Sequence, residues 1–189
     1  MTAGLASERR ARAVVFEAPG RLAVRELALA AAGDADVVVD VEWTGISAGT
    51  ERLLWTGRMP HFPGLGYPLV PGYEAVGRVR HAGPASGRAV GERVFLPGAY
   101  SFADARNLFG GAAATLVAPG ARAIPVGDAL AEASVLLALG ATAMHALHAP
   151  DDGAPALPDL IVGHGALGRI AARLAIALGG APLTSSTRR

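Results

Sequence analysis

The first two thirds of the chain show short apolar runs with a two-residue period, separated by glycine and proline. Residues 12–16 ("RAVVF") and 21–27 ("RLAVREL") flank the turn-forming segment "EAPG", which predicts a β-hairpin. Residues 36–47 ("DVVVDVEWTGIS") are β-branched and begin with alternation. The apolar members of this alternation share one face of the expected strand and the acidic members share the other; they are Val37, Val39 and Val41 against Asp40 and Glu42.

Further strand patterns continue as far as residue 126. They are "YEAVGRVRHAG" at 73–83, "GERVFLPGAY" at 91–100 and "ATLVAPGARAIPV" at 114–126, the last of which predicts another pair of strands. Between them, residues 53–74 are rich in glycine, proline and aromatic residues and fit no single period. This segment is either a functional loop or a packed surface loop. Many short strands divided by glycine and proline favour a small, closed β-structure.

The pattern changes to a helical one near residue 128. Residues 128–150 predict a connecting helix, with Asp128 as its N-cap and Glu132 in its first turn. A linker, "PDDGAPALPD", comes next, and then an apolar strand, "DLIV", a glycine-rich turn and a helix over about 166–178. The sequence therefore predicts an α/β chain with a β-rich N-terminal part. Its expected parts are a flexible extension over 1–11, a β-domain over 12–127, the connecting helix over 128–150 and a βα unit over 158–189.

Composition and charge exclude several classes of protein. The chain has 189 residues, of which 51% are hydrophobic and 17% charged, so it can bury a sizeable core. Its net charge of +1 gives no reason to expect nucleic acid as a partner. No cysteine is present, which excludes disulfides and thiolate metal sites. The polar residues within 130–148 argue against a membrane span, and the N-terminus lacks a secretion signal, so we expect a cytoplasmic location.

The glycine-rich turn carries a dinucleotide-binding pattern. Gly163, Gly165 and Gly168 fit G-x-G-x-x-G between a strand and a helix, where glycines permit the turn, the approach of a pyrophosphate and close helix packing. The expected cofactor-binding residues are Gly163, His164, Gly165, Ala166, Leu167 and Gly168. His164 either donates to a phosphate or is an exposed turn histidine. A glycine-rich turn unrelated to nucleotides is the alternative.

The rest of a dinucleotide-binding fold is not recognisable. An acidic residue is expected about 20 residues after the turn to bind the ribose hydroxyls, but no Asp or Glu follows Asp159. The final segment, "APLTSSTRR", contains Pro182 and a polar run and is a poor candidate for the second strand. We therefore expect one strand of a sheet that needs about six.

Four segments together resemble the medium-chain dehydrogenase/reductase superfamily. They are "GISAGTE" at 45–51, "PLVPGYEAVGRV" at 68–79, "VGERVFLPGA" at 90–99 and "GHGALGR" at 163–169. More narrowly, residues 49–74 resemble the bacteriochlorophyllide dehydrogenases, which oxidise a 3-(1-hydroxyethyl) group to acetyl. The resemblance covers residues 12–180.

The resemblance implies a GroES-like β-barrel catalytic domain followed by the first βα unit of an incomplete Rossmann fold. It implies NAD as the cofactor, with NADP not excluded, and a chlorin pigment intermediate as the small-molecule substrate. A homodimer is compatible with the full-length form. Because so little of the Rossmann fold is recognisable, we expect the chain to be C-terminally truncated and inactive by itself.

Alignment with the superfamily also indicates a zinc-independent reaction. Zinc members commonly hold the metal with a cysteine, a histidine and a third ligand. Here Ser47 or Ala48 stands in place of the cysteine and Tyr73 in place of the histidine, and the carboxylate of Glu74 alone does not hold zinc. We therefore expect no metal ligands.

Thr50, Tyr73 and Glu74 remain as the candidate catalytic residues. Oxidation of an alcohol needs a group that accepts the hydroxyl proton, and Thr50 and Tyr73 are the candidates, with Glu74 orienting one of them. Each residue also has a structural alternative: Thr50 caps a helix, Tyr73 belongs to the core, and Glu74 accepts hydrogen bonds from loop amides.

Four aromatic residues are candidates for the wall of the substrate pocket. Trp43, Trp55, Phe62 and Tyr67 suit a flat macrocycle but are equally ordinary as core residues. Two alternative functions stay open: a zinc-free quinone or enoyl reductase of the same superfamily, and a non-catalytic GroES-like binding module.

Overall fold

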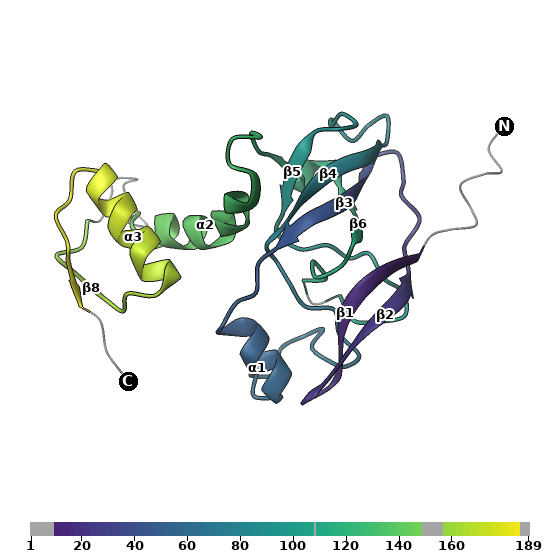
Figure 1. The fold of residues 1–189 in the computed structure, drawn as a ribbon, viewed down its shortest axis with the longest axis horizontal. Coiled ribbons are helices and arrows are strands. Elements are labelled where there is room, and N and C mark those ends of the chain that lie inside the picture. The colour runs from purple at the N-terminus through teal and green to yellow at the C-terminus, as the bar shows by residue number, and fades with distance from the viewer. Residues whose placement is uncertain (1–9, 108, 149–156, 186–189) are drawn as a thin grey trace. The chain divides into compact units, whose positions relative to one another are not determined.

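The computed structural model describes residues 10–107, 109–148 and 157–185, which divide into two compact units between Val135 and Leu136. The first unit is built from strands and the second is a small αβ unit (Figure 1). The expected extension falls outside the described residues, except that Arg10 and Ala11 begin the first strand. The expected linker lies outside them over residues 149–156.

The first unit contains two antiparallel sheets. Its elements, in chain order, are β1 (Arg10–Ala18), β2 (Arg21–Ala28), β3 (Asp36–Thr44), α1 (Thr50–Thr56), β4 (Ala75–Ala82), β5 (Arg93–Leu96), β6 (Thr115–Pro119), the 3₁₀ turn η1 (Gly120–Arg122) and β7 (Ile124–Pro125). The predicted hairpin is confirmed, with β1 and β2 paired so that Val14 faces Val24 across the ladder. The second sheet has the strand order β6-β3-β4-β5-β7 (Figure 1).

The prediction that residues 114–126 form a strand pair is wrong. β6 pairs with β3 and β7 pairs with β5, so the two strands lie at opposite edges of the five-stranded sheet. The 3₁₀ turn at Gly120–Arg122 separates them, and Gly120 lies so close to the backbone of Ser86 that a side chain there would overlap it. After this turn the chain runs to the opposite edge of the five-stranded sheet. The choice of edge depends on the contact with Ser86, which the local sequence pattern does not contain.

One hydrophobic core joins the two sheets. Alternation along β3 is confirmed, because Val37 and Val39 are fully buried whereas Asp40 pairs with Arg80 at the surface. The other large members of this core come from both sheets and from the loop before β4, and are Val15, Val70, Val79, Val94, Leu96 and Leu116. Burying each such side chain contributes about 1.5–3 kcal/mol, so this core fixes the loops that leave the sheets.

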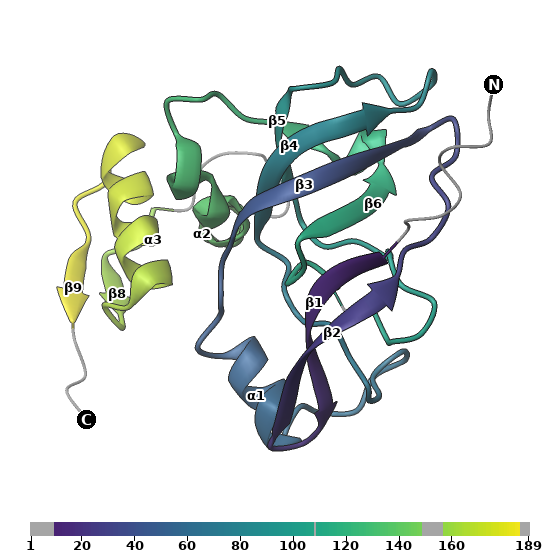
Figure 2. The same cartoon turned by 45° about the vertical axis from the view of Figure 1, so that its right-hand side comes forward.

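The second unit is a βαβ arrangement with a preceding helix. Its elements are the 3₁₀ segment η2 (Ala131–Leu136), which leads into it, α2 (Leu137–Ala146), β8 (Leu160–Val162), α3 (Ala166–Ala177) and β9 (Leu183–Ser185) (Figure 2). The helix predicted over 128–150 is thus a 3₁₀ segment followed by a ten-residue α-helix. In the part of the chain with coordinates, no helix is long and apolar enough to cross a membrane.

The second strand of this unit exists, contrary to the expectation from "APLTSSTRR". β9 pairs parallel to β8, with Leu183 donating to the carbonyl of Asp159 at 2.9 Å and Gly163 donating to that of Ser185 at 2.8 Å. Pro182 directly precedes the strand, a position where its missing N–H interrupts no ladder bond. The predicted strand and helix on either side of the glycine turn are confirmed as β8 and α3.

Candidate active site

The loop between β3 and α1 is held by hydrogen bonds that start at Ser47. The Ser47 hydroxyl accepts from the amides of Gly49 and Thr50 at 3.2 and 3.0 Å, and the Ser47 amide donates to Oε2 of Glu51 at 2.9 Å. This reciprocal pattern resembles a capping box, in which one side chain and one acid satisfy free amides at a helix start. The start of α1 is therefore fixed by Ser47 rather than by Thr50.

Two of the predicted catalytic side chains come together. The hydroxyls of Thr50, on α1, and Tyr73, just ahead of β4, lie 3.5 Å apart, and both residues are half-buried. The Tyr73 ring also meets the edge of Phe109, with ring centroids 5.2 Å apart. Phe109 has φ of 72°, in the left-handed region that bulky residues rarely adopt. The phenol is thus positioned by a strained neighbour and faces a second hydroxyl.

Glu74, the third predicted residue, follows Tyr73 in the chain and is buried. It is 5% exposed, and its Oε1 has no hydrogen-bond partner among the residues described. Its backbone carbonyl accepts from the amide of Gly45 at 2.9 Å. A Cβ on Gly45 would overlap Oε2 of Glu74 and lie 2.9 Å from its Cβ, so the carboxyl group rests on bare backbone. Only glycine leaves room for Glu74 at position 45.

Sequence reasoning missed a second buried acid, Glu51. It is 7% exposed, and within the described chain its Oε1 also lacks a partner. Burial raises the pKa of Glu51, opposed by hydrogen bonds from its own amide and from Ser47 and Gly72. Burial, together with the charge of Glu51, raises the pKa of Glu74. The signal in the sequence was an acid four residues after Ser47, one residue more than the spacing of a capping box.

The donor atoms around Glu74 do not match a zinc site. Zinc sites in proteins combine thiolate and imidazole donors with at most a few carboxylates. Here segments 47–51 and 73–74 offer only the carboxyl groups of Glu51 and Glu74 and the hydroxyls of Ser47, Thr50 and Tyr73. Among residues 10–107, 109–148 and 157–185, no three His, Asp or Glu side chains gather to hold a metal ion.

The four predicted aromatic residues do not share one site. Trp55 and Tyr67 belong to a second hydrophobic cluster around Phe16, Leu54 and Leu69. Trp55 meets the Phe16 ring edge-on, with centroids 5.7 Å apart, and the Tyr67 hydroxyl donates to the carbonyl of Leu54. Phe62 is half-buried, and its carbonyl accepts from the Leu65 amide at 3.1 Å.

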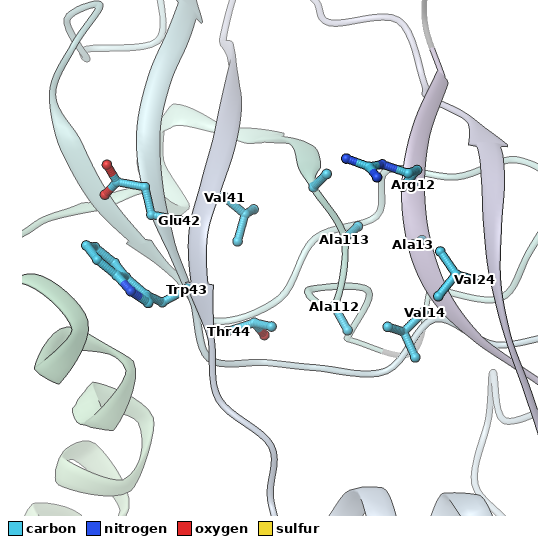
Figure 3. Close-up of a pocket in the computed structure, with 11 residues that line it drawn as sticks. Arg12, Ala13, Val14, Val24, Val41, Glu42, Trp43, Thr44, Ala112 and Ala113 are labelled. Carbon is cyan, nitrogen blue, oxygen red and sulfur yellow. The ribbon is translucent and has the colours of Figure 1, made fainter.

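Trp43 instead lines an open pocket of about 330 Å³ between the β1–β2 hairpin and β3 (Figure 3). Small apolar side chains form most of the wall, with Arg12 and Glu42 at its margins. The guanidinium of Arg93 lies 5.3 Å from the Trp43 ring and pairs with Glu42 and Asp128. Arg93 holds the Trp43 ring by a cation–π contact. In Figure 3 the ring extends to the other side of β3 from Val41 and Ala113.

The glycine turn in the second unit has the geometry that phosphate binding requires. Gly163 has φ of 98°, and a Cβ on Gly168 would overlap the carbonyl oxygen of Gly163, so both must be glycine for the turn and the helix to pack. Gly165 is different: its φ is −76°, and a Cβ there would meet nothing within 4 Å in the described residues. Neither strain nor packing requires glycine at 165.

Glycine at position 165 leaves open space in front of the helix start. The bare backbone leaves the first amides of α3, those of Ala166, Leu167 and Gly168, accessible at a helix N-terminus, where an anion is favoured. His164 is exposed beside them. These residues fit the pyrophosphate of a dinucleotide.

Known dehydrogenases resemble this chain over most of its length. The sequence profile of the alcohol dehydrogenase GroES-like domain matches residues 33–128. The 2-desacetyl-2-hydroxyethyl bacteriochlorophyllide A dehydrogenase of Cereibacter sphaeroides is 51% identical over 178 residues, covering 92% of this chain and 55% of the relative. The protein of the same name from Rhodobacter capsulatus is 49% identical over 170 residues, covering 89% of this chain and 53% of the relative. The chain thus spans about half the length of the curated relatives that it matches.

A solved structure supports the same fold. The structure of a putative zinc-binding dehydrogenase from Sinorhizobium meliloti, bound to NADP, matches with a TM-score of 0.69 and 25% identity, covering 94% of this chain and 56% of that one. The expected fold class, a GroES-like β-domain followed by the first βα unit of a Rossmann fold, is confirmed.

Proposed function

Because the chain belongs to the medium-chain dehydrogenase/reductase superfamily and carries its GroES-like alcohol dehydrogenase domain, we propose that it serves a zinc-independent oxidation of an alcohol. The proposed substrate is the hydroxyethyl group of a bacteriochlorophyllide, which is oxidised to acetyl. The observation that carries this proposal is the identity of about half of all residues, along nine tenths of the chain, to two dehydrogenases named for that substrate.

The hydroxyl pair supplies the proton-accepting part of the reaction. Oxidation of a secondary alcohol removes a hydride from carbon and a proton from oxygen, leaving a C=O bond. A bound nicotinamide dinucleotide, proposed to be NAD, would supply the hydride acceptor. As the substrate O–H bond breaks, its proton would pass to the Tyr73 oxygen while the Tyr73 proton passes to Thr50, 3.5 Å away, and the Thr50 proton passes to water. Glu74 supports the start of β4 that carries Tyr73.

The side chains in segments 47–51 and 73–74 are poor zinc ligands, which supports the zinc-independent form of the proposal. Serine, threonine and tyrosine hydroxyls are weak ligands for zinc, and no thiolate exists in this chain. In place of a metal, the Tyr73 oxygen orients the substrate by accepting a hydrogen bond from its hydroxyl group. Of the aromatic residues, Trp43 is the one we place beside the macrocycle, because it alone of the four is among the residues that line the open pocket. Trp55 and Tyr67 then act by supporting α1 from the second hydrophobic cluster.

A chimera tests the proposal. This chain replaces the matching 55% of the Cereibacter sphaeroides relative, and the product is assayed with the hydroxyethyl chlorin and NAD or NADP. We expect NADH and the acetyl chlorin to form in equal amounts, with no change after treatment with a zinc chelator. Reduction of quinones without chlorin oxidation would favour the reductase alternative. Failure to bind either chlorin or dinucleotide would favour a non-catalytic module.

A further inference from the structure

One face of β1 places Arg12 in the wall of the open pocket. Ala11, Ala13 and Val15 are buried, so the side chains of Arg12 and Val14 lie on the opposite face of the strand. Both residues line the pocket, and in Figure 3 the guanidinium of Arg12 extends from β1 toward the space between β1 and β3. The alternation of β1 therefore gives the pocket a basic group.

The acidic group of the same wall is already paired. Glu42 pairs with Arg93 at 2.9 Å and with Arg78 at 3.4 Å. Across the described ranges of the chain, Arg12 takes part in no ion pair, although Glu26 faces it in the β1–β2 ladder. The charge that the pocket offers to a ligand is therefore positive.

The rest of the wall suits an apolar group. Val14, Val24 and Val41 and the alanines of segment 112–114 supply small side chains, which leave room for a ring and bury apolar surface against it. A guanidinium matches a carboxylate because its planar fork can donate two parallel hydrogen bonds. The ligand that complements this wall is an apolar ring with a carboxylate at its edge.

Backbone pairing joins the pocket to the segment that carries Tyr73. Thr44 pairs with Ala75 in the β3–β4 ladder, and the amide of Ala112 donates to the carbonyl of Pro71 at 2.8 Å. Thr44 and Ala112 both line the pocket. A ring bound there borders residues that pair with the backbone on either side of Tyr73.

We propose that Arg12 binds a carboxylate at the edge of an apolar ring substrate and thereby selects the free acid over its ester. The inference rests on the proposed function for the kind of ring, a chlorin, and deepens it by naming the group that the pocket recognises. Arg12 acts in binding and not in the hydride or proton transfer, so Arg12→Gln in the chimera should raise KM about 5-fold and leave kcat unchanged.

Binding to this chain without a dinucleotide tests the proposal. Pyropheophorbide a, a chlorin with one free carboxyl group, and its methyl ester are titrated against the chain at neutral pH, and chlorin fluorescence is followed. We expect the wild type to bind the acid about 5-fold more tightly than the ester, the size of effect that an exposed ion pair gives. Arg12→Gln should remove this preference and leave ester binding unchanged. Arg21→Gln, on the same hairpin but paired with Glu17 and outside the pocket, should change neither affinity.

Equal affinities of the wild type for acid and ester would overturn the proposal, as would a parallel loss of both ligands in Arg12→Gln. Binding of neither ligand would also overturn it, because every residue of the wall belongs to this chain. If Arg12→Gln does not fold, as judged by circular dichroism, salt decides with the wild type. The preference for the acid should vanish as sodium chloride rises from about 50 mM to about 1 M, and a preference that persists would contradict an ionic contact.

The proposed oxidation is judged separately. A chimera that does not oxidise the hydroxyethyl chlorin, beside a chain that still prefers the acid through Arg12, would contradict the proposed function and support the carboxylate site.

Discussion

Gly168 packs against Gly163 so closely that a Cβ on the former would overlap the carbonyl oxygen of the latter. The contact joins the first turn of α3 to the end of β8, and it is what brings the helix N-terminus over the turn. The first and third glycines of the pattern therefore serve the fold, whereas the second is free of any such demand.

This difference predicts opposite results for two alanine substitutions. Gly168→Ala forces the helix away from the strand and should lower the free energy of unfolding of the second unit by about 1–3 kcal/mol. Gly165→Ala should leave stability unchanged but weaken dinucleotide binding by about 10-fold, because its methyl group enters the space left for a ligand. Urea unfolding of the chain and calorimetry with NAD on the chimera measure the two effects. Equal loss of stability in both variants would contradict the assignment.

Gly45 should be similarly intolerant, because Glu74 fills the space where a side chain would stand. Gly45→Ala must displace the buried carboxyl group, and we expect a loss of about 1–3 kcal/mol in urea unfolding. Gly127→Ala is the matched control, since a Cβ there meets nothing within 4 Å among the described residues. A Gly45→Ala chain as stable as the control would mean that Glu74 does not rest on this backbone.

Ser47, rather than Thr50, should hold the start of α1. Ser47→Ala removes the acceptor for the amides of Gly49 and Thr50 and should lower the unfolding free energy by about 1 kcal/mol. Thr56→Ala, which removes a hydroxyl bonded to the carbonyl of Arg52 near the other end of α1, should change it by less than about 0.5 kcal/mol. The comparison is made by chemical denaturation, and a larger effect of the Thr56 substitution would contradict it.

The raised pKa of Glu74 gives stability a definite dependence on pH. Burial and the Glu51 charge raise this pKa above the ordinary 4.5, so ionisation is disfavoured in the folded state. Stability from this group is complete below pH 4.5 and is lost as pH rises through the raised pKa. Glu74→Gln should therefore stabilise the chain by on the order of 1 kcal/mol at about pH 8.

The gain should disappear as the pH approaches 4.5, where the wild-type acid is also neutral. Thermal melts across this range measure it, with Glu26→Gln as the exposed control. A variant less stable than wild type at high pH would show that the folded protein needs the ionised form.

Tyr73 should matter for the reaction and not for the fold. Tyr73→Phe keeps the edge contact with Phe109 but removes the hydroxyl that faces Thr50, so kcat of the chimera should fall by about 100-fold with little change in KM. Thr50→Val removes the second hydroxyl of the relay and should give a smaller loss. Steady-state kinetics decide between them, and an unchanged kcat in Tyr73→Phe would remove the residue from the proposed mechanism.

Local pattern was enough to predict the elements whose signals are short-range. The hairpin of β1 and β2, the alternation of β3 and the strand–turn–helix around Gly163 depend on neighbours within a few residues, and each is present. The family motifs likewise located Thr50, Tyr73 and Glu74. These features follow from turn chemistry and from the period of buried side chains, which the sequence states directly.

Contacts between distant segments decided the rest. β6 and β7 lie at opposite edges of the sheet, and β9 pairs with β8. Both pairings depend on which strand edges are free after folding. Glu51 became a candidate only when folding buried it near Glu74, 23 positions away in the chain. Burial and the approach of like charges are properties of the packed chain, because a carboxyl group loses its water only when remote segments close over it.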